Sequence, residues 1–277
     1  MPELPDLEYI VENLAPQVEG LSIQKAEILN PIVFRILLPD FKPETLFGLH
    51  IEKLNRHGPF LDFTLSGDLK IVYHPMLAGR VYFDAKKPRK TKSDCFRVDF
   101  TNGAALIFRD NKQMGKVYIL REGETAQIPR FETQGPDVFS PEFTEKYFIS
   151  KINKSRKQVR VFIMEQEIIS AIGNAYADET MFEAGLHPKT LCSQLSLEEK
   201  KRLYASIIKV MSWGIESVKN AAPALDAKHR EHVRVRNRGG QPCPSCGEKI
   251  RKAGVRGYDA FFCPRCQPSR RTQFIAW

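Results

Sequence analysis

Four of the six cysteines form two closely spaced pairs near the end of the chain, and this pattern restricts the fold more than any other feature. Cys243 and Cys246 form one Cys-x-x-Cys pair, and Cys263 and Cys266 form a second after sixteen intervening residues. Two such pairs at this separation can surround one tetrahedral Zn²⁺ ion, each pair lying on one knuckle of a hairpin. A reducing cytosol disfavours disulfides, and the duplication disfavours a redox-active pair. We therefore expect one structural zinc ion that does no chemistry.

Positive charge is concentrated in the same region. The formal net charge is +9, and residues 229–277 hold eleven Lys and Arg against three acidic residues, whereas residues 1–228 hold 31 against 30. A basic module on a neutral body is typical of a protein that binds a polyanion. No apolar run approaches the length of a membrane span, and the acidic, proline-rich start lacks the order of a signal peptide. We expect a cytoplasmic, nucleoid-associated protein without a membrane partner.

Short runs rich in β-branched and aromatic residues occupy residues 20–122 and predict the strands of a sandwich or barrel. Thr101-Asn102-Gly103 predicts a hairpin turn between two of them. The basic stretch KKPRKTK at 86–92 interrupts the runs and fits either a solvated turn or a phosphate contact. The runs are 22–29, 48–55, 60–65, 70–74, 80–83, 95–100, 104–108 and 116–120.

After residue 133 the sequence becomes helical. Gly135-Pro136 and Ser140-Pro141 punctuate a linker, and we expect Ser140 to cap a helix that begins at Pro141. Helices are also predicted over 156–169 and 195–218, where apolar residues recur with helical spacing.

The first residues, MPELPDLEYI, combine a predicted helix start with two residues that a helix does not explain. Pro5 and Asp6 suit a first helical turn. If Met1 is removed, as a small second residue permits, Pro2 becomes the N-terminus and carries a secondary amine. Such an amine is a nucleophile. An ordinary capped helix is the alternative for this stretch.

Residues 170–188 read SAIGNAYADETMFEAGLHP. Gly173 and Asn174 predict a tight turn that starts a helix at about Tyr176, where exposed amides can bind a phosphate, and Gly185 ends that helix. The segment resembles the helix-two-turns-helix signature of the formamidopyrimidine-DNA glycosylase and endonuclease VIII family. The MPELP start and the zinc ribbon ending CPRCQ are similar to the family's other two signatures, in the same order. The opening ELP resembles the formamidopyrimidine branch.

The resemblance implies an α+β fold in three parts: an N-terminal β-sandwich with an N-terminal helix, a helical helix-two-turns-helix domain and a C-terminal zinc-ribbon hairpin. We place the boundaries at residues 1–132, 133–228 and 229–277. The resemblance further implies a monomer that holds double-stranded DNA, containing a damaged base or an abasic site, between the first two parts.

The implied function is that of a bifunctional DNA glycosylase/AP lyase of base excision repair. In the family the proline amine, here that of Pro2, attacks C1′ of the damaged nucleoside, and β- and δ-elimination then cut the strand. Glu3 would be the general acid/base. Asp6 stands where the family often has Glu, and its role stays open.

The family also fills the gap left by the flipped nucleotide with a Met-Arg-Phe trio. HPMLAGR and RDNKQMG place Leu77, Lys112 and Met114 at those positions. This set is still apolar, cationic and apolar, so a plug of the gap is expected; core packing is the alternative for Leu77 and Met114. Asn174 matches the family's phosphate-binding asparagine.

Two expected phosphate contacts are altered. Pro59 replaces the family's loop lysine, and proline has neither the charge nor an amide hydrogen. Tyr258 stands where the zinc hairpin normally has arginine, and Arg256 is a substitute if the hairpin tip is shifted. Arg56 and His57 are candidates to compensate for the lost lysine, although His57 also fits an ordinary surface histidine.

Two other functions stay open. A non-catalytic or lyase-weak damaged-DNA-binding protein on the same scaffold would explain Pro59 and Tyr258, whereas a zinc-ribbon nucleic-acid binder unrelated to repair leaves MPELP unexplained. The loop near 217–231 would contact the base, but its sequence does not indicate which damaged base it recognises. Oxidised purine is the expectation from ELP, with oxidised pyrimidine or a bulky adduct as alternatives.

Overall fold

The computed structural model describes residues 2–86 and 88–270, and the chain divides into two compact units. The first unit contains the residues up to 133 together with the segment 218–229. The second contains residues 134–217 and the chain from 230 onward. Among the described residues, no helix is both long enough and apolar enough to cross a membrane.

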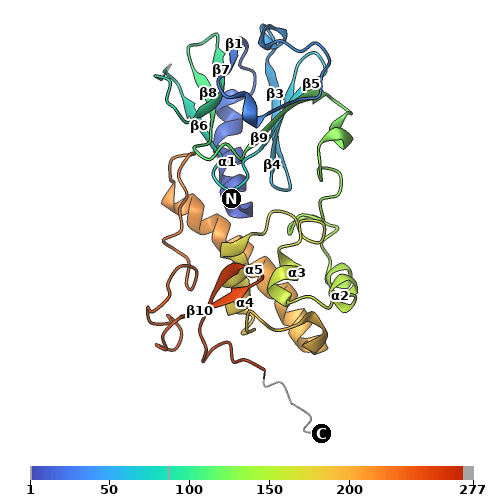
Figure 1. The fold of residues 1–277 in the computed structure, drawn as a ribbon, viewed down its shortest axis with the longest axis vertical. Coiled ribbons are helices and arrows are strands. Elements are labelled where there is room, and N and C mark those ends of the chain that lie inside the picture. The colour runs from blue at the N-terminus through green and yellow to red at the C-terminus, as the bar shows by residue number, and fades with distance from the viewer. Residues whose placement is uncertain (1, 87, 271–277) are drawn as a thin grey trace. The chain divides into compact units, whose positions relative to one another are not determined.

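Two β-sheets face each other in the first unit (Figure 1). The ring of Phe108 meets the rings of Phe63 and Tyr73 from the opposite sheet, at centroid distances of 5.8 and 4.7 Å. One sheet has the order β1 (Ile23–Ile28), β7 (Asp94–Phe100), β8 (Ala105–Arg109) and β6 (Arg80–Asp84). The other has the order β2 (Phe34–Ile36), β9 (Lys116–Arg121), β5 (Leu69–His74), β4 (Phe60–Leu65) and β3 (Ile51–His57).

The sandwich and its strands agree with the sequence prediction. All eight predicted runs contain a strand, and the predicted turn at Thr101-Asn102-Gly103 joins β7 to β8, with Gly103 at φ +89°. The sequence did not predict β2, which follows a 3₁₀ turn at Pro31–Val33 and pairs in parallel with β9.

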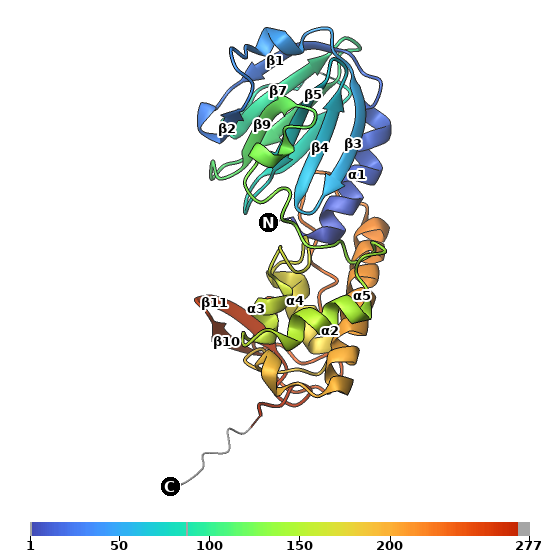
Figure 2. The ribbon, with the colours of Figure 1, turned by 90° about the vertical axis from the view of Figure 1, so that its right-hand side faces the viewer.

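Helix α1 (Leu4–Val18) packs along β3 (Figure 2) and buries Leu7, Ile10 and Leu14 against the sandwich. Its N-terminus shows what Asp6 does. The Asp6 carboxylate accepts the Glu3 backbone N–H at 2.7 Å and so caps the first turn. Asp6 thereby fixes the backbone at Glu3, directly after Pro2.

The second unit is helical, but two of its predicted helix boundaries were wrong. The helix expected from Pro141 is α2 (Glu145–Asn153), capped by Thr144, whose Oγ1 accepts the Tyr147 N–H at 3.1 Å. Ser140 lies in a turn before this helix, where its N–H donates to the Asp137 carbonyl.

The helix expected over 156–169 is shorter in the structure, as α3 (Val159–Ile163). The side chain of Gln166 donates to the Met164 and Ile172 carbonyls and accepts the Ala171 N–H, so this side chain supplies the hydrogen bonds that a continued helix would have made.

Three elements complete the second unit. Helix α4 (Asn174–Glu183) starts close to the predicted position and ends before Gly185, which has φ +65°. Helix α5 (Leu197–Ala221) covers the predicted long helix. Strands β10 (Arg251–Val255) and β11 (Tyr258–Phe262) form the C-terminal hairpin, whose buried side chains pack with the cysteines on Phe182 of α4. The α+β fold class is therefore confirmed.

Candidate functional site

In the first unit, Pro2 and Glu3 precede α1 directly, and both are buried. Only 3% of Glu3 is exposed, and its N–H is held by Asp6. The packing of α1 on β3 therefore fixes a carboxylate next to the residue that would carry an amine after removal of Met1.

Leu77 lies on a turn between β5 and β6, and 55% of it is exposed. The turn closes through the Gly79 N–H, which donates to the Pro75 carbonyl at 2.7 Å. Core packing, the alternative weighed for Leu77, does not describe this side chain. Leu77 is therefore a surface side chain, as the wedge role expected for it requires.

A single carboxylate shapes the loop that carries Lys112 and Met114. Asp110 is 3% exposed and accepts the backbone N–H groups of Lys112, Met114 and Gly115 at 2.8, 2.8 and 2.6 Å. Leu77 and Lys112 both line an open pocket of about 440 Å³, whereas Met114 is absent from its lining. The structure thus brings two of the three predicted wedge residues to one pocket.

His74, at the end of β5, is a residue that the sequence analysis did not select. Burial lowers the pKa of its imidazole to about 4, so the ring is neutral at neutral pH. Its Nδ1 accepts the Met76 N–H at 3.0 Å, and Phe60 packs edge-on at 4.7 Å between centroids. His74 therefore helps to hold the turn that presents Leu77.

The cations expected to compensate for Pro59 are engaged within the unit. Gly58 and Pro59 form the turn between β3 and β4, and Pro59 is buried. Arg56 donates to the Glu8 carboxylate at 2.8 Å and to the Gly58 carbonyl at 3.1 Å. The ring of His57 stacks on Phe131, and its Nε2 lies 2.8 Å from the Phe131 carbonyl oxygen.

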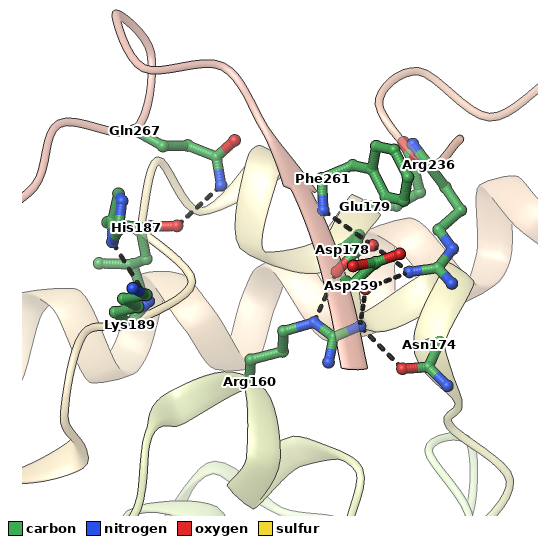
Figure 3. Close-up of polar contacts among 11 residues, drawn as sticks. Arg160, Asn174, Asp178, Glu179, His187, Lys189, Arg236, Asp259, Phe261 and Gln267 are labelled. Atoms are coloured by element: carbon green, nitrogen blue, oxygen red, sulfur yellow. Dashed lines mark hydrogen bonds and ion pairs between the residues drawn. The ribbon is translucent and has the colours of Figure 1, made fainter. Parts of the chain in front are cut away.

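In the second unit, Asn174 is the first residue of α4, and its side chain is oriented by a buried arginine (Figure 3). The Arg160 Nη2 donates to Asn174 Oδ1 at 2.8 Å, and its Nε donates to Asp178 Oδ1 at 2.6 Å. Arg160 is fully buried. Arg160 therefore fixes the side chain of Asn174 through its carbonyl oxygen, at the N-terminus of α4, where an anion is favoured.

The same network joins α4 to the hairpin. Arg236 Nη1 donates to Asp178 Oδ2 and to the Asp259 carbonyl, both at 2.7 Å, and the Phe261 N–H donates to Asp178 Oδ2 at 3.2 Å (Figure 3). Burial raises the pKa of Asp178, while the guanidinium groups of Arg160 and Arg236 oppose that rise. Breaking this network would leave buried charges without partners.

The hairpin tip is a two-residue turn, Arg256-Gly257, closed by the pairing of Val255 with Tyr258. Both turn residues have positive φ, +46° and +78°. Tyr258 is 61% exposed, beside the turn. Tyr258, which aligns with the family's expected arginine, and Arg256, the nearest cationic residue, therefore both lie at the tip.

The four thiols Cys243, Cys246, Cys263 and Cys266 cluster, with all sulfur atoms within 4.8 Å of one another. Two of the sulfur separations are 3.4 and 3.9 Å. A tetrahedral Zn²⁺ with Zn–S bonds of about 2.3 Å has sulfurs ~3.8 Å apart, so the cluster fits this ion. A backbone hydrogen bond from Glu248 lowers the pKa of Cys246 to about 7, whereas burial raises the pKa values of Cys263 and Cys266, so the fit to a metal rests on the geometry of the four sulfurs.

The sequence analysis missed Asp110 and Arg160 as well as His74. Asp110 lies in RDNKQMG and Arg160 in QVRVFIM, and neither stretch matches a motif that assigns these two residues a role. The available signal for Arg160 was a single charge inside an apolar run, since a buried charge requires a partner.

Family models match the chain along most of its length. Residues 1–117 match the formamidopyrimidine-DNA glycosylase N-terminal domain, residues 134–223 its H2TH domain, and residues 240–268 a zinc finger found in FPG and IleRS. The formamidopyrimidine-DNA glycosylase of Desulforamulus reducens is 30% identical over 98% of this chain and 100% of its own length. The chain belongs to the formamidopyrimidine-DNA glycosylase family. The Symbiobacterium thermophilum member is 32% identical, over 97% of this chain and 90% of its own.

Solved structures of the family have the same fold. The Lactococcus lactis formamidopyrimidine-DNA glycosylase with abasic-site DNA has a TM-score of 0.87 and 26% identity, covering 96% of this chain and 100% of that one. Its complex with N7-benzyl-Fapy-dG DNA has a TM-score of 0.88, also at 26% identity, covering 97% and 100%. The recognised family and the three-part fold are therefore both shown for this chain.

Proposed function

We propose that this chain is a bifunctional DNA glycosylase/AP lyase that excises damaged bases, oxidised bases in particular, from duplex DNA in base excision repair. The observation that carries the proposal is the position of Pro2 and the buried Glu3 at the start of α1. Family membership supports it, and relatives of known structure bind abasic-site or damaged DNA.

In the proposed reaction, the amine of processed Pro2 attacks C1′, the bond between C1′ and the base breaks, and the base leaves with the proton that the amine loses. Glu3 protonates the ring oxygen as the sugar opens, which leaves an iminium between Pro2 and C1′. Loss of a C2′ proton then expels the 3′ phosphate, and a second elimination expels the 5′ phosphate. The cationic iminium accepts the electrons of each elimination.

Contacts with DNA are assigned to both units. Leu77 and Lys112, together with Met114, would occupy the gap left by the extruded nucleotide, because a wedge must replace the lost stacking. Asn174, Arg256 and Tyr258 would contact the backbone. We retain 1–132, 133–228 and 229–277 as the functional division of a monomeric protein.

The zinc ribbon is proposed to hold one Zn²⁺ ion with a structural role. A site closed by four sulfurs has no open position for substrate, so the ion supplies folding energy to the hairpin rather than chemistry. The hairpin then presents Arg256 and Tyr258 on an ordered turn.

A damaged-DNA-binding protein without lyase activity is the second candidate. Pro59 favours it, because this buried residue replaces a lysine and because Arg56 and His57 are engaged elsewhere. The intact Pro2 and Glu3 favour the enzyme.

A single-turnover assay with excess protein separates the two candidates. Duplexes bearing an oxidised purine, an oxidised pyrimidine or a preformed abasic site are tested for base loss and for strand ends. The enzyme should give both eliminations on the abasic duplex, and Glu3→Gln should reduce base excision more than abasic-site cleavage, because the abasic site has no base to expel. Glu52→Gln, an exposed change on β3, is the control. Binding without cleavage of any duplex would support the second candidate.

A further inference from the structure

The segment 218–229 is attached to the sandwich unit at successive points along its length. Near its start, the Lys219 ammonium lies 2.5 Å from the Glu12 carboxylate of α1. The Tyr9 hydroxyl then donates to the Pro223 carbonyl at 2.8 Å. Further along, Asp226 Oδ2 lies 3.5 Å from Arg109 Nη1, at the end of β8. The last contact is the only one of these that reaches the strands rather than α1.

Arg109 is held in place by groups other than Asp226. Its Nε donates at 2.8 Å to Asp94, whose side chain is fully buried, and its guanidinium lies 3.8 Å from the ring centroid of Tyr82. Asp94 is fixed in turn by the N–H and hydroxyl of Thr91, at 3.0 and 2.6 Å. A guanidinium that is already ordered loses little further freedom when it binds a second carboxylate.

The contact between Arg109 and Asp226 forms part of a pocket wall. Both residues line the pocket of about 440 Å³ that also contains Leu77 and Lys112, and Asp226 is the one lining residue that comes from segment 218–229. At the pocket, the segment is therefore joined to the sandwich by a carboxylate whose side chain is 31% exposed.

We propose that Arg109 and Asp226 form a latch that fixes residues 222–229 against the sandwich beside this pocket. Under the proposed function, in which the loop near 217–231 would contact the base being excised, Arg109 is then a positioning residue for that segment. The link to base excision rests on the proposed function, whereas the latch itself does not. Because Asp226 is partly exposed, added salt weakens the latch.

The test uses Asp226→Asn in the full-length, zinc-loaded protein, since Asp226→Asn leaves the pair formed by Arg109 and the buried Asp94 intact. Hydrogen exchange of amides in 222–229 should become roughly two- to fivefold faster at low salt, as expected for the loss of a partly exposed ion pair. High salt should bring the wild-type rate close to that of the variant. Glu44→Gln, which removes one exposed carboxylate elsewhere in the same unit, should leave exchange unchanged. Equal exchange in wild type and Asp226→Asn at low salt would overturn the latch.

A second measurement tests the positioning role. In single turnover, Asp226→Asn should slow base excision from a lesion duplex by a similar factor and leave cleavage of a preformed abasic site unchanged; Asp226→Glu should restore part of the loss. An equal reduction of both reactions would overturn the role in base positioning. If the wild type acts on no duplex, the proposed function fails, and the exchange measurement still decides the latch.

Discussion

At the scale of single residues, Gly79 shows how closely the turn carrying Leu77 is packed. A Cβ at this position would lie 2.1 Å from the Tyr73 hydroxyl and 2.4 Å from the Pro75 carbonyl oxygen. Gly79→Ala should therefore destabilise the sandwich unit by about 1–3 kcal/mol, because the turn must move. Urea unfolding measures this loss. Gly254→Ala in β10, where a Cβ meets nothing within 4 Å, should have little effect. A Gly79→Ala protein as stable as wild type would contradict the described packing.

His74 gives a prediction on pH. Burial lowers the pKa of its imidazole from 6.5 to about 4, so between these values the unfolded chain binds more protons than the folded one. The contribution of the neutral ring to the free energy of unfolding should be fully present above pH 6.5. It should decrease as the pH falls toward 4, by at most about 3 kcal/mol. His74→Asn keeps an acceptor for the Met76 N–H but does not titrate. Urea unfolding from pH 7.5 to 4.5 should show a shallower decline in this variant; parallel curves would contradict the prediction.

Individual residues also show what the sequence could and could not predict about the site. Pro2 and Glu3 can be proposed from the sequence because the chemistry expected of them is local: Pro2 follows Met1, and Glu3 is its neighbour. Asp110 and Arg160 act through groups that the fold brings to them, namely three loop amides for Asp110 and the side chains of Asn174 and Asp178 for Arg160. Such partners are not visible in a single sequence.

At the scale of elements, the zinc hairpin should depend on its metal. Its buried cluster includes Cys243 and Cys263 together with Val235, Ile250 and Phe182 of α4. Freshly purified protein should contain one equivalent of zinc by metal analysis. Cys263→Ser should contain well under one equivalent and bind DNA weakly, because the hairpin loses its order without the ion. Cys95→Ser, at a buried thiol in β7, should keep its zinc. Full zinc content in Cys263→Ser would contradict the ligand assignment.

The sequence predicted an element correctly where the residues of that element alone determine its structure. It failed where a partner distant in sequence determines whether the element forms or where it ends. The sandwich strands of five residues or more contain enough β-branched and aromatic residues to be recognised. Strand β2 has three residues, and its pairing with β9 creates it. Helix α3 ends early because Gln166 supplies hydrogen bonds in place of the helix, which the spacing of the apolar residues within 156–169 does not reveal.

At the scale of the whole molecule, the family could be predicted because three separated motifs occur in a fixed order, and each reflects a physical requirement. The zinc pairs require a fixed spacing, the helix N-terminus requires a tight turn, and the proposed nucleophile requires a free N-terminal amine. The segment 218–229 belongs with the sandwich unit although it follows the helical region in sequence. Its contacts are with residues distant in sequence, namely Tyr9, Glu12 and Arg109, so a single sequence does not indicate this grouping.

The measurement that tests the central claim most directly is the identity of the residue that DNA captures. An abasic-site duplex is incubated with protein whose Met1 is verified as absent, borohydride reduces any iminium, and peptide mass spectrometry locates the adduct. The account predicts one adduct on the nitrogen of Pro2, strong loss of the adduct in Pro2→Gly, and none in protein with a blocked N-terminus. An adduct on a lysine, or no adduct with an unblocked Pro2, would contradict it.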